Sequence, residues 1–182
     1  MPGALWLVGM MGAGKSTIGP VVAGLLGRPF VDTDDIVVQT AGQSVQAIFE
    51  SEGERGFRER ERAAILEVAK RGAVVSLGGG AIAQPGAPEQ LAALGTVVYL
   101  RARLATLMNR IGDGSHRPML SGMSAEEREQ RVADLLAERA SAYESAQLFV
   151  DVDNWEVDSI AELIASQVRK LEAGLARSGD ER

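Results

Sequence analysis

The eight residues from Gly9 to Ser16, GMMGAGKS, form a complete G-x-x-x-x-G-K-S pattern. An apolar run at residues 4–8 precedes it, and a helical pattern at residues 15–26 follows it. A strand, a glycine-rich loop and a helix in this order make a phosphate-binding loop, in which backbone N–H groups surround a phosphate. Such a short pattern also occurs by chance, so the prediction depends on the strand before the loop and the helix after it. Lys15 should then reach the outer phosphates, and the Ser16 hydroxyl should ligate Mg²⁺.

An acidic pair, Asp32 and Asp34, follows a short apolar run at residues 29–31 and precedes a helical pattern. One interpretation is a helix N-cap, for which Asp is well suited. The other uses sheet geometry, because a strand beside the phosphate loop delivers its last residues next to a bound triphosphate. Asp32 would then orient Mg²⁺ through a water molecule, and Asp34 would accept a hydrogen bond from an attacking hydroxyl. The two interpretations are compatible.

Arginines at three places could neutralise anionic ligands. Arg58 lies in a charge-dense helical pattern where most charges should be solvated i,i+4 partners, but Phe57 beside it marks an apolar border and Glu61 could hold its guanidinium. The segment 112–118 combines hinge glycines with a proline and resembles a mobile lid, from which Arg117 could reach the phosphates. Arg110 could stack on an adenine ring. We interpret His116 as a solvated loop residue.

Three consecutive glycines, Gly78 to Gly80, end an apolar run at residues 73–77. Glycines lose backbone entropy on folding and supply no side chain, so packing does not explain three of them. A simple turn needs only one or two. The pattern therefore favours a place where a ligand lies against bare backbone.

The elements that must position these residues alternate along the chain. Strands are expected at residues 4–8, 29–31, 73–77, 96–100 and 148–152. Helices are expected at residues 15–26, 33–40, 45–50, 57–71, 87–94, 104–110, 125–145 and 157–171. This alternation predicts an α/β fold with three layers, a parallel sheet with helices on both faces, and ligands beyond the carboxyl ends of the strands. Pro20 inside the first helix is the one local conflict.

The composition suits an ordinary globular protein, with 46% hydrophobic and 24% charged residues in 182. One domain is expected over residues 1–182, with substrate-binding helices at about 33–62, a lid at about 111–123 and a frayed tail at 173–182. The net charge of -6 argues against a nucleic-acid partner. With no cysteine, thiol chemistry is excluded, and with His116 as the only histidine we expect no histidine-based triad or multi-histidine metal site. We expect no membrane span, a cytoplasmic location and a monomer.

Taken together, the motifs resemble the shikimate kinase family in order and interval over nearly the whole chain. The residues that carry the resemblance are Gly9, Lys15-Ser16-Thr17, Asp32-Thr33-Asp34, Phe57-Arg58, Ser76-Leu77-Gly78-Gly79-Gly80, Arg117-Pro118 and Arg139-Ala140-Ser141-Ala142-Tyr143. The phosphate loop alone is shared by many enzymes. The combination of the acidic pair, the Phe-Arg pair and the triple glycine is narrow.

This resemblance implies a P-loop kinase that phosphorylates the 3-hydroxyl of shikimate with ATP and Mg²⁺, on the route to aromatic amino acids. It implies that Lys15, Asp34 and Arg117 are catalytic. ATP would be bound by Gly12, Ala13, Gly14, Lys15, Ser16, Thr17, Arg110 and Arg117, and Mg²⁺ by Ser16 and Asp32. Shikimate would be bound by Asp34, Arg58, Gly79, Gly80, Arg139, Phe49 and Phe57. Two alternatives are a kinase of another hydroxylated acid such as gluconate, and a nucleotide-binding regulatory module without transfer activity.

Overall fold

The computed structural model describes residues 3–114, 118–154 and 156–179, and the structural statements below concern these residues. Five strands form one sheet in the spatial order β2-β3-β1-β4-β5, and every neighbouring pair is parallel. The strands are β1 (Ala4–Val8), β2 (Phe30–Asp32), β3 (Val74–Ser76), β4 (Gly95–Arg101) and β5 (Leu148–Asp151). The strands expected from the sequence are confirmed, with ends that shift by at most one residue.

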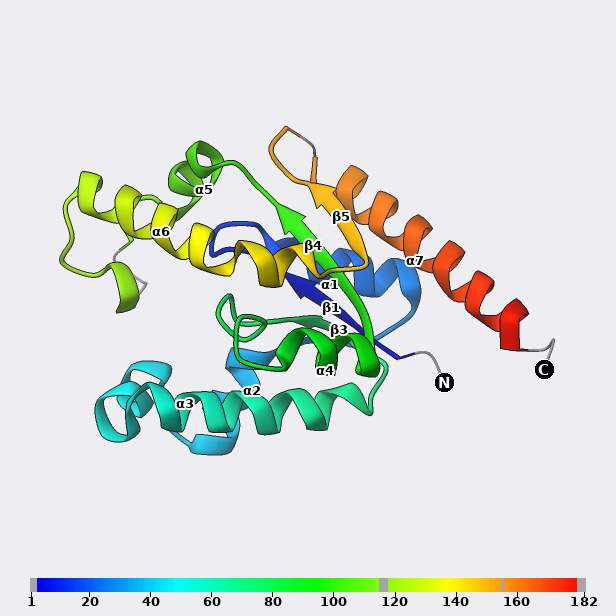
Figure 1. Ribbon diagram of the computed structural model, residues 1–182, viewed down its shortest axis with the longest axis horizontal. Coiled ribbons are helices and arrows are strands. Elements are labelled where there is room, and N and C mark those ends of the chain that lie inside the picture. Colours follow the sequence, from blue (N-terminus) through cyan, green and yellow to red (C-terminus); the bar gives the residue numbers. More distant parts are fainter. Residues whose placement is uncertain (1–2, 115–117, 155, 180–182) are drawn as a thin grey trace.

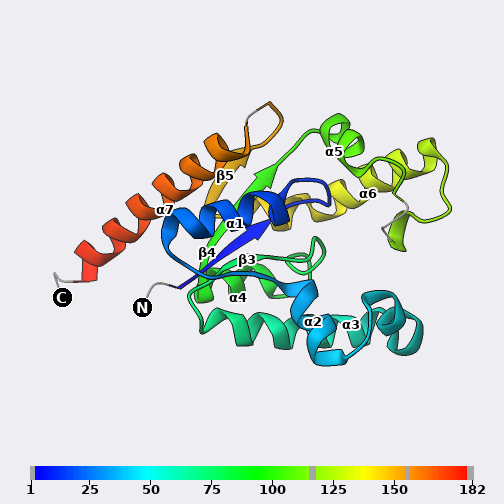
Figure 2. The same ribbon diagram turned by 180° about the vertical axis from the view of Figure 1, so that it is seen from behind.

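Helices cover both faces of this sheet, so the predicted three-layer architecture is confirmed. In Figure 1 the helices α4 and α6 lie in front of the sheet and α3 runs below α4, whereas α1 and α7 lie in front of the sheet in the opposite view of Figure 2. Residues of α3 and α4 share one core cluster. The helices are α1 (Lys15–Leu26), α2 (Thr33–Ala41), α3 (Val45–Ala69), α4 (Ala87–Leu94), α5 (Leu104–Ile111), α6 (Ala125–Glu144) and α7 (Val157–Gly179), with a short 3-10 turn η1 at Pro118–Leu120.

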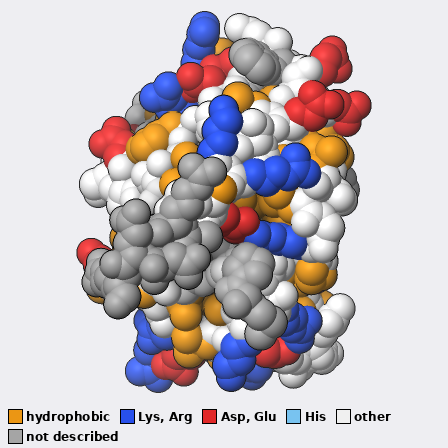
Figure 3. All heavy atoms as spheres, turned by 90° about the vertical axis from the view of Figure 1, so that its right-hand side faces the viewer, with side chains coloured by type: hydrophobic (Ala, Val, Ile, Leu, Met, Phe, Trp, Pro, Cys, Tyr) orange, Lys and Arg blue, Asp and Glu red, His pale blue; other side chains and the backbone are white. Residues whose placement is uncertain are grey.

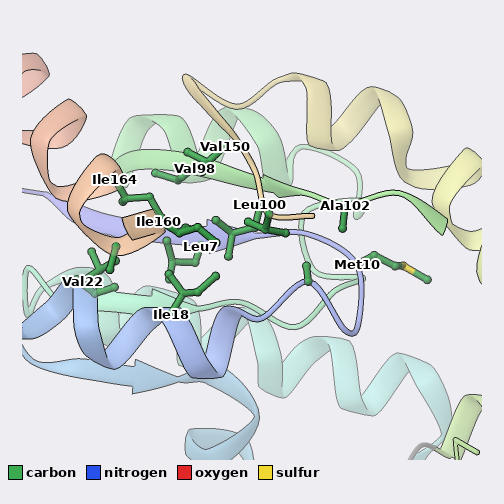
Figure 4. Close-up of a cluster of buried hydrophobic side chains, with 14 of the residues drawn as sticks. Leu7, Met10, Ile18, Val22, Val98, Leu100, Ala102, Val150, Ile160 and Ile164 are labelled. Carbon is green, nitrogen blue, oxygen red and sulfur yellow. The ribbon is translucent and has the colours of Figure 1, made fainter. Parts of the chain in front are cut away.

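The alternation of side chains along β1 explains how one strand serves both layers. Leu5 and Leu7 join a core cluster with α1 and α7, whereas Trp6 and Val8 face a second cluster with α3 and α4. All five β1 residues are buried, as expected for the central strand of a parallel sheet. Figure 4 shows the first cluster, with Met10 at its far end where the chain leaves β1. The phosphate loop therefore follows directly from a strand that is buried on both faces.

Two expected helices, at 45–50 and 57–71, meet as one bent element. Helix α3 runs from Val45 to Ala69, but Gly53 in its middle has φ 69° and ψ -176°, which is not helical. This backbone conformation is essentially restricted to glycine. The bend places Phe49 before it and Phe57 after it.

Helix α7 is longer than the sequence indicated. We expected a helix over residues 157–171, but the helix continues to Gly179, and fraying of residues 173–182 stays a prediction. Ala173, Leu175, Ala176 and Arg177 have high helix propensity, which favours this extension. The expected irregularity at Pro20 also does not end α1, which continues to Leu26 with Pro20 on its exposed side.

Part of the predicted lid lies outside the described residues, including His116 and Arg117. No helix of the described residues is long and apolar enough to cross a membrane. Figure 3 views the molecule from the side where the strands begin, opposite the phosphate loop, and there the acidic and basic side chains are interspersed.

Candidate active site

The phosphate loop has the backbone geometry that its sequence predicts. Gly9, Gly12 and Gly14 have φ of 146°, 81° and 93°, values that L side chains rarely adopt. A Cβ atom at Gly9 would also lie only 2.6 Å from the carbonyl oxygen of Leu100 on β4. The Lys15 ammonium folds over the loop, where it donates to the carbonyl oxygens of Gly9 at 2.8 Å and Met10 at 3.2 Å. The lysine is thus already placed above the loop.

Ser16 and Asp32 lie together, although sixteen positions separate them. The Ser16 hydroxyl donates to Asp32 Oδ2 at 3.0 Å. The other carboxylate oxygen of Asp32 accepts from the backbone N–H of Asp34 at 3.1 Å and caps α2. The N-cap interpretation is therefore confirmed, and it leaves Asp32 beside the phosphate loop. Both interpretations of this aspartate can hold at once.

A pocket of about 370 Å³ opens between the phosphate loop, β2 and the end of β3. Asp34 lines it and reaches solvent, yet the surrounding protein atoms raise the pKa of its carboxyl group. The charge of Asp32 raises that pKa further, whereas Lys15 and Arg58 oppose the shift. The full lining is Met11, Gly12, Gly14, Lys15, Ser16, Thr17, Asp32, Asp34, Ser76, Leu77, Gly78, Gly79 and Arg110. Sequence-predicted residues for both the donor and the acceptor therefore share one cavity.

A larger cavity of about 640 Å³ lies at the ends of β4 and β5 beside α6. Tyr99 and Phe149 contribute to its walls, and its Arg101 is paired with Asp151. None of the sequence-predicted site residues lines it. Size alone therefore does not locate the chemistry in this molecule.

The three glycines after β3 lie where side chains crowd the backbone. A Cβ atom at Gly78 would stand 2.4 Å from Glu61 Oε1, and one at Gly80 would stand 2.6 Å from Arg58 Nη2. At Gly79 the nearest side-chain atom would be Nη1 of Arg139, at 3.4 Å. The bare backbone that the sequence assigned to a ligand is thus also the surface on which Glu61, Arg58 and Arg139 rest.

Arg58 is held as the sequence predicted. Its Nη1 atom donates to Glu61 Oε2 at 2.7 Å, and its Nη2 atom donates to Glu54 Oε1 at 3.2 Å. The guanidinium also lies 5.3 Å from the centre of the Phe57 ring, within reach of a cation–π interaction. Phe57 in turn packs on Phe49 across the bend in α3, with ring centres 4.8 Å apart. One aromatic pair and one arginine therefore stand together beside the glycines.

Arg139 reaches the same place from α6 and is only 7% exposed. Its Nη1 atom lies 3.8 Å from the sulfur of Met10 in the phosphate loop. Tyr143, one helical turn later, donates its hydroxyl proton to the carbonyl oxygen of Gly79 at 2.7 Å. Burial raises the pKa of Tyr143 to about 12, so it remains a donor near neutral pH. Helix α6 thus brings a cation and a hydroxyl group to the glycine segment.

Arg110 lines the pocket from α5 and donates to the carbonyl oxygen of Val152 at 2.6 Å. It joins the phosphate loop to the segment after β5, which the sequence alone left unassigned. Arg117 lies outside the described residues, so its expected approach to the phosphates stays a prediction.

Comparison with known proteins decides the family. The family model for shikimate kinase matches residues 11–169. A shikimate kinase of Chlorobium chlorochromatii is 39% identical over 186 aligned residues, which cover 99% of this chain and 98% of that relative. The solved structure titled shikimate kinase from Acinetobacter baumannii in complex with shikimate is 37% identical, with a TM-score of 0.85 over 93% of this chain and 94% of that one. The chain belongs to the shikimate kinase family.

A gluconokinase from Sinorhizobium meliloti is also similar in structure, with a TM-score of 0.66 over 97% of each chain. Its sequence is only 21% identical, so this likeness shows a shared fold and nothing more. Membership of the shikimate kinase family makes this protein a phosphotransferase with a P-loop.

Sequence reasoning gave no role to two residues of this shikimate kinase family site, Thr33 and Tyr143. Thr33 is fully buried, donates to the carbonyl oxygen of Ser76 and accepts from the N–H of Gly78 at 3.1 Å. Tyr143 carried a usable signal, because it stands four residues after Arg139 and must share its helix face.

Proposed function

We propose that the protein transfers the terminal phosphoryl group of ATP to the 3-hydroxyl of shikimate, which gives shikimate 3-phosphate and ADP. The observation that carries the proposal is the shared pocket, which Lys15 and Ser16 line on the phosphate side and Asp34 lines on the acceptor side. Phosphoryl transfer needs alignment and charge neutralisation more than covalent help from the protein. A pocket that joins both groups of residues supplies that alignment.

The acceptor end suits a small hydroxylated carboxylate. Arg58 and Arg139 approach the glycine segment from α3 and α6, and guanidinium groups recognise carboxylates through paired donors. They explain how a chain with a net charge of -6 would hold two anionic ligands. Phe49 and Phe57 would form the wall against the carbon ring. The relative from Acinetobacter baumannii was solved in complex with shikimate, which supports the same acceptor here.

Asp34 would accept a hydrogen bond from the attacking hydroxyl. Its raised pKa makes the carboxylate a better proton acceptor than an ordinary aspartate, while its exposure in the pocket keeps it accessible. Nearby Lys15 and Arg58 oppose the shift, because both lower the pKa of this carboxyl group. Transfer of the proton to Asp34 or simple orientation of the hydroxyl would both use this geometry.

The residues around Ser16 and Asp32 fit a magnesium ion carried by the nucleotide. Mg²⁺ bound to a nucleotide takes most of its ligands from phosphates and water and needs only one or two from the protein. The Ser16 hydroxyl and the Asp32 carboxylate, in contact beside the phosphate loop, could supply these. When bound, Mg²⁺ would neutralise charge on the phosphate oxygens. Among the described residues no cluster of three or more His, Cys, Asp or Glu gathers for a metal. The proposed site therefore depends on the nucleotide for completion.

Lys15 and Arg117 would stabilise charge at the phosphates from two sides. Lys15 already lies over the loop, and Arg117 would arrive when the lid closes and excludes water.

We further propose a monomeric cytoplasmic enzyme of aromatic amino acid synthesis. Size-exclusion chromatography tests the oligomeric state, and we expect a single symmetric peak at about 19 kDa.

A coupled assay of ADP release tests the proposed function. The purified protein is supplied with ATP, Mg²⁺ and, in separate reactions, shikimate, gluconate or other hydroxy acids. We expect a signal with shikimate, and its removal by a chelator of Mg²⁺. A signal with gluconate alone would support the alternative hypothesis of a gluconate kinase, and nucleotide binding without any ADP release would indicate a regulatory module. Phosphorus NMR of the product checks that a phosphate ester has formed.

A further inference from the structure

We propose that Thr33 and Tyr143, neither of which is assigned to touch a substrate, act as a clamp that fixes the backbone of the triple glycine for binding of the acceptor carboxylate. This inference rests on the proposed function. Three glycines in a row have more conformational freedom than any other segment of this length. Their shape must therefore be imposed by contacts from outside the segment.

The contacts that impose it come from two different layers. On one side Thr33, at the start of α2, accepts from the N–H of Gly78 at 3.1 Å and donates to the carbonyl oxygen of Ser76 at 3.3 Å. On the other side Tyr143 of α6 donates to the carbonyl oxygen of Gly79 at 2.7 Å. A third bond, from the N–H of Ala81 to the carbonyl oxygen of Gly78 at 2.9 Å, closes a turn between them.

These bonds determine where the next N–H groups point. In a planar trans peptide the N–H points away from its C=O. With the carbonyl of Gly78 turned to Ala81 and that of Gly79 turned to Tyr143, the N–H groups of Gly79 and Gly80 must point away from those two partners. Gly79 lines the pocket and lies beside Arg139, so such donors would add to the arginines in holding a carboxylate.

Both clamp side chains are enclosed by the packing around them. Thr33 is 0% exposed, and Tyr143 is 0% exposed and stacked on Tyr99, with ring centres 4.9 Å apart and planes 13° apart. A side chain whose conformation is fixed by packing holds the backbone group that it binds in place. The two residues are positioning residues, and their effect should appear in acceptor binding.

Single-atom variants test this. Tyr143→Phe and Thr33→Val each delete one hydroxyl group and keep the size of the side chain. The matched controls are Tyr99→Phe, which deletes a hydroxyl from the stacked partner ring, and Thr40→Val, which deletes one in α2 that bonds only within its helix. We expect the KM for shikimate to rise about five- to tenfold in both clamp variants, with kcat and the KM for ATP within about twofold of wild type. The two controls should match wild type, and Thr33→Ser should restore the KM because it retains the hydroxyl.

An unchanged KM for shikimate in folded clamp variants, or an equal rise in the KM for ATP, would overturn the clamp. Hydrogen exchange of the Gly78 amide, followed by NMR without any substrate, reads the loop independently. It should be at least about tenfold faster in Thr33→Val than in Thr40→Val, because the amide loses its acceptor. A wild-type protein without transfer to shikimate would refute the proposed function, and the exchange rates would still decide whether the loop is clamped.

Discussion

The Nη1 atom of Arg58 lies 2.7 Å from Glu61 Oε2, and only 2% of the Glu61 side chain is exposed to water. Burial raises the pKa of Glu61, while the charge and hydrogen bond of Arg58 lower it, and burial is the larger effect. The pair therefore holds Arg58, which we propose to bind the acceptor, in place by means of a carboxylate that the fold keeps out of water.

The pH dependence of stability should reveal this burial. A carboxyl group with a raised pKa binds its proton more tightly in the folded state, so it stabilises the fold in acid and loses that contribution as pH rises through the folded-state pKa. Glu61→Gln removes the titration and keeps a hydrogen-bond acceptor. We expect the difference in Tm, variant minus wild type, to increase as pH rises from about 4 to about 8. Glu67→Gln, at a half-exposed pair in the same helix, is the control, and a reversed slope would contradict the prediction.

Loss of Arg58 should weaken acceptor binding selectively. We expect Arg58→Ala to raise the KM for shikimate by about 10- to 100-fold, because charge-assisted hydrogen bonds to a carboxylate are lost. The KM for ATP should stay within about twofold. Arg62→Ala removes an exposed arginine from the next turn of α3 and should behave as wild type. If both variants raise the KM for shikimate equally, Arg58 acts only through the general charge of the surface and does not bind the acceptor.

Asp34 should be needed for transfer and dispensable for nucleotide binding. Asp34→Asn is expected to lower kcat by at least about a hundredfold, with ATP affinity by titration calorimetry unchanged. Asp35→Asn, the neighbouring exposed carboxylate, should remain active. Because the pKa of Asp34 is raised, the acid limb of kcat/KM should lie above the usual range for an aspartate. If Asp34→Asn also loses ATP affinity, Asp34 contributes to nucleotide binding and its assignment to the acceptor is wrong.

Of two adjacent residues in the expected lid, we predict that Arg117 is needed for turnover and that His116 is not. We expect Arg117→Ala to lower kcat by about 10²- to 10³-fold, because a cation that stabilises charge in the transition state is lost, with little change in Tm. His116→Ala should leave kcat near wild type, since the mechanism has no step for the imidazole. Steady-state kinetics of both variants, with circular dichroism as the folding check, decide this. Normal turnover by Arg117→Ala would remove the residue from the mechanism.

The bend in α3 should depend on one glycine. Gly53→Ala forces a Cβ atom onto a backbone with φ 69° and ψ -176°, and we expect it to destabilise the protein by about 1–3 kcal/mol. Gly24→Ala lies within α1 with no atom near its Cβ position, so it should stabilise by about 0.5–1 kcal/mol. Urea unfolding measures both. If Gly53→Ala is neutral, the bend is not restrained by its backbone conformation.

The sequence predicts best where the signal is local. The phosphate loop and the Arg58–Glu61 pair depend on residues within one or two turns, and both are present as expected. The strands follow from apolar runs because a buried parallel strand needs a nearly continuous one. The bend at Gly53 was not predicted, because the sequence indicated two separate helical patterns at residues 45–50 and 57–71.

Contacts between distant segments could not be predicted from spacing. Thr33 meets Gly78 across 45 positions, and Tyr143 meets Gly79 across 64. Both depend on how the sheet stacks its strands and how α6 returns over it, which a linear pattern does not encode. The length of α7 was underestimated for another reason, since the small and polar composition of its last turns masked good helix formers.

The crowded glycines restrict how this pocket can evolve or be redesigned. A larger residue at Gly78 or Gly80 would push away the end of the Glu61 or Arg58 side chain, and we propose that Arg58 binds the acceptor carboxylate. Reshaping the cavity from that side would therefore disturb the proposed anion site. New acceptor selectivity would arise more readily by exchange of Phe49 and Phe57, which we propose to contact the carbon ring.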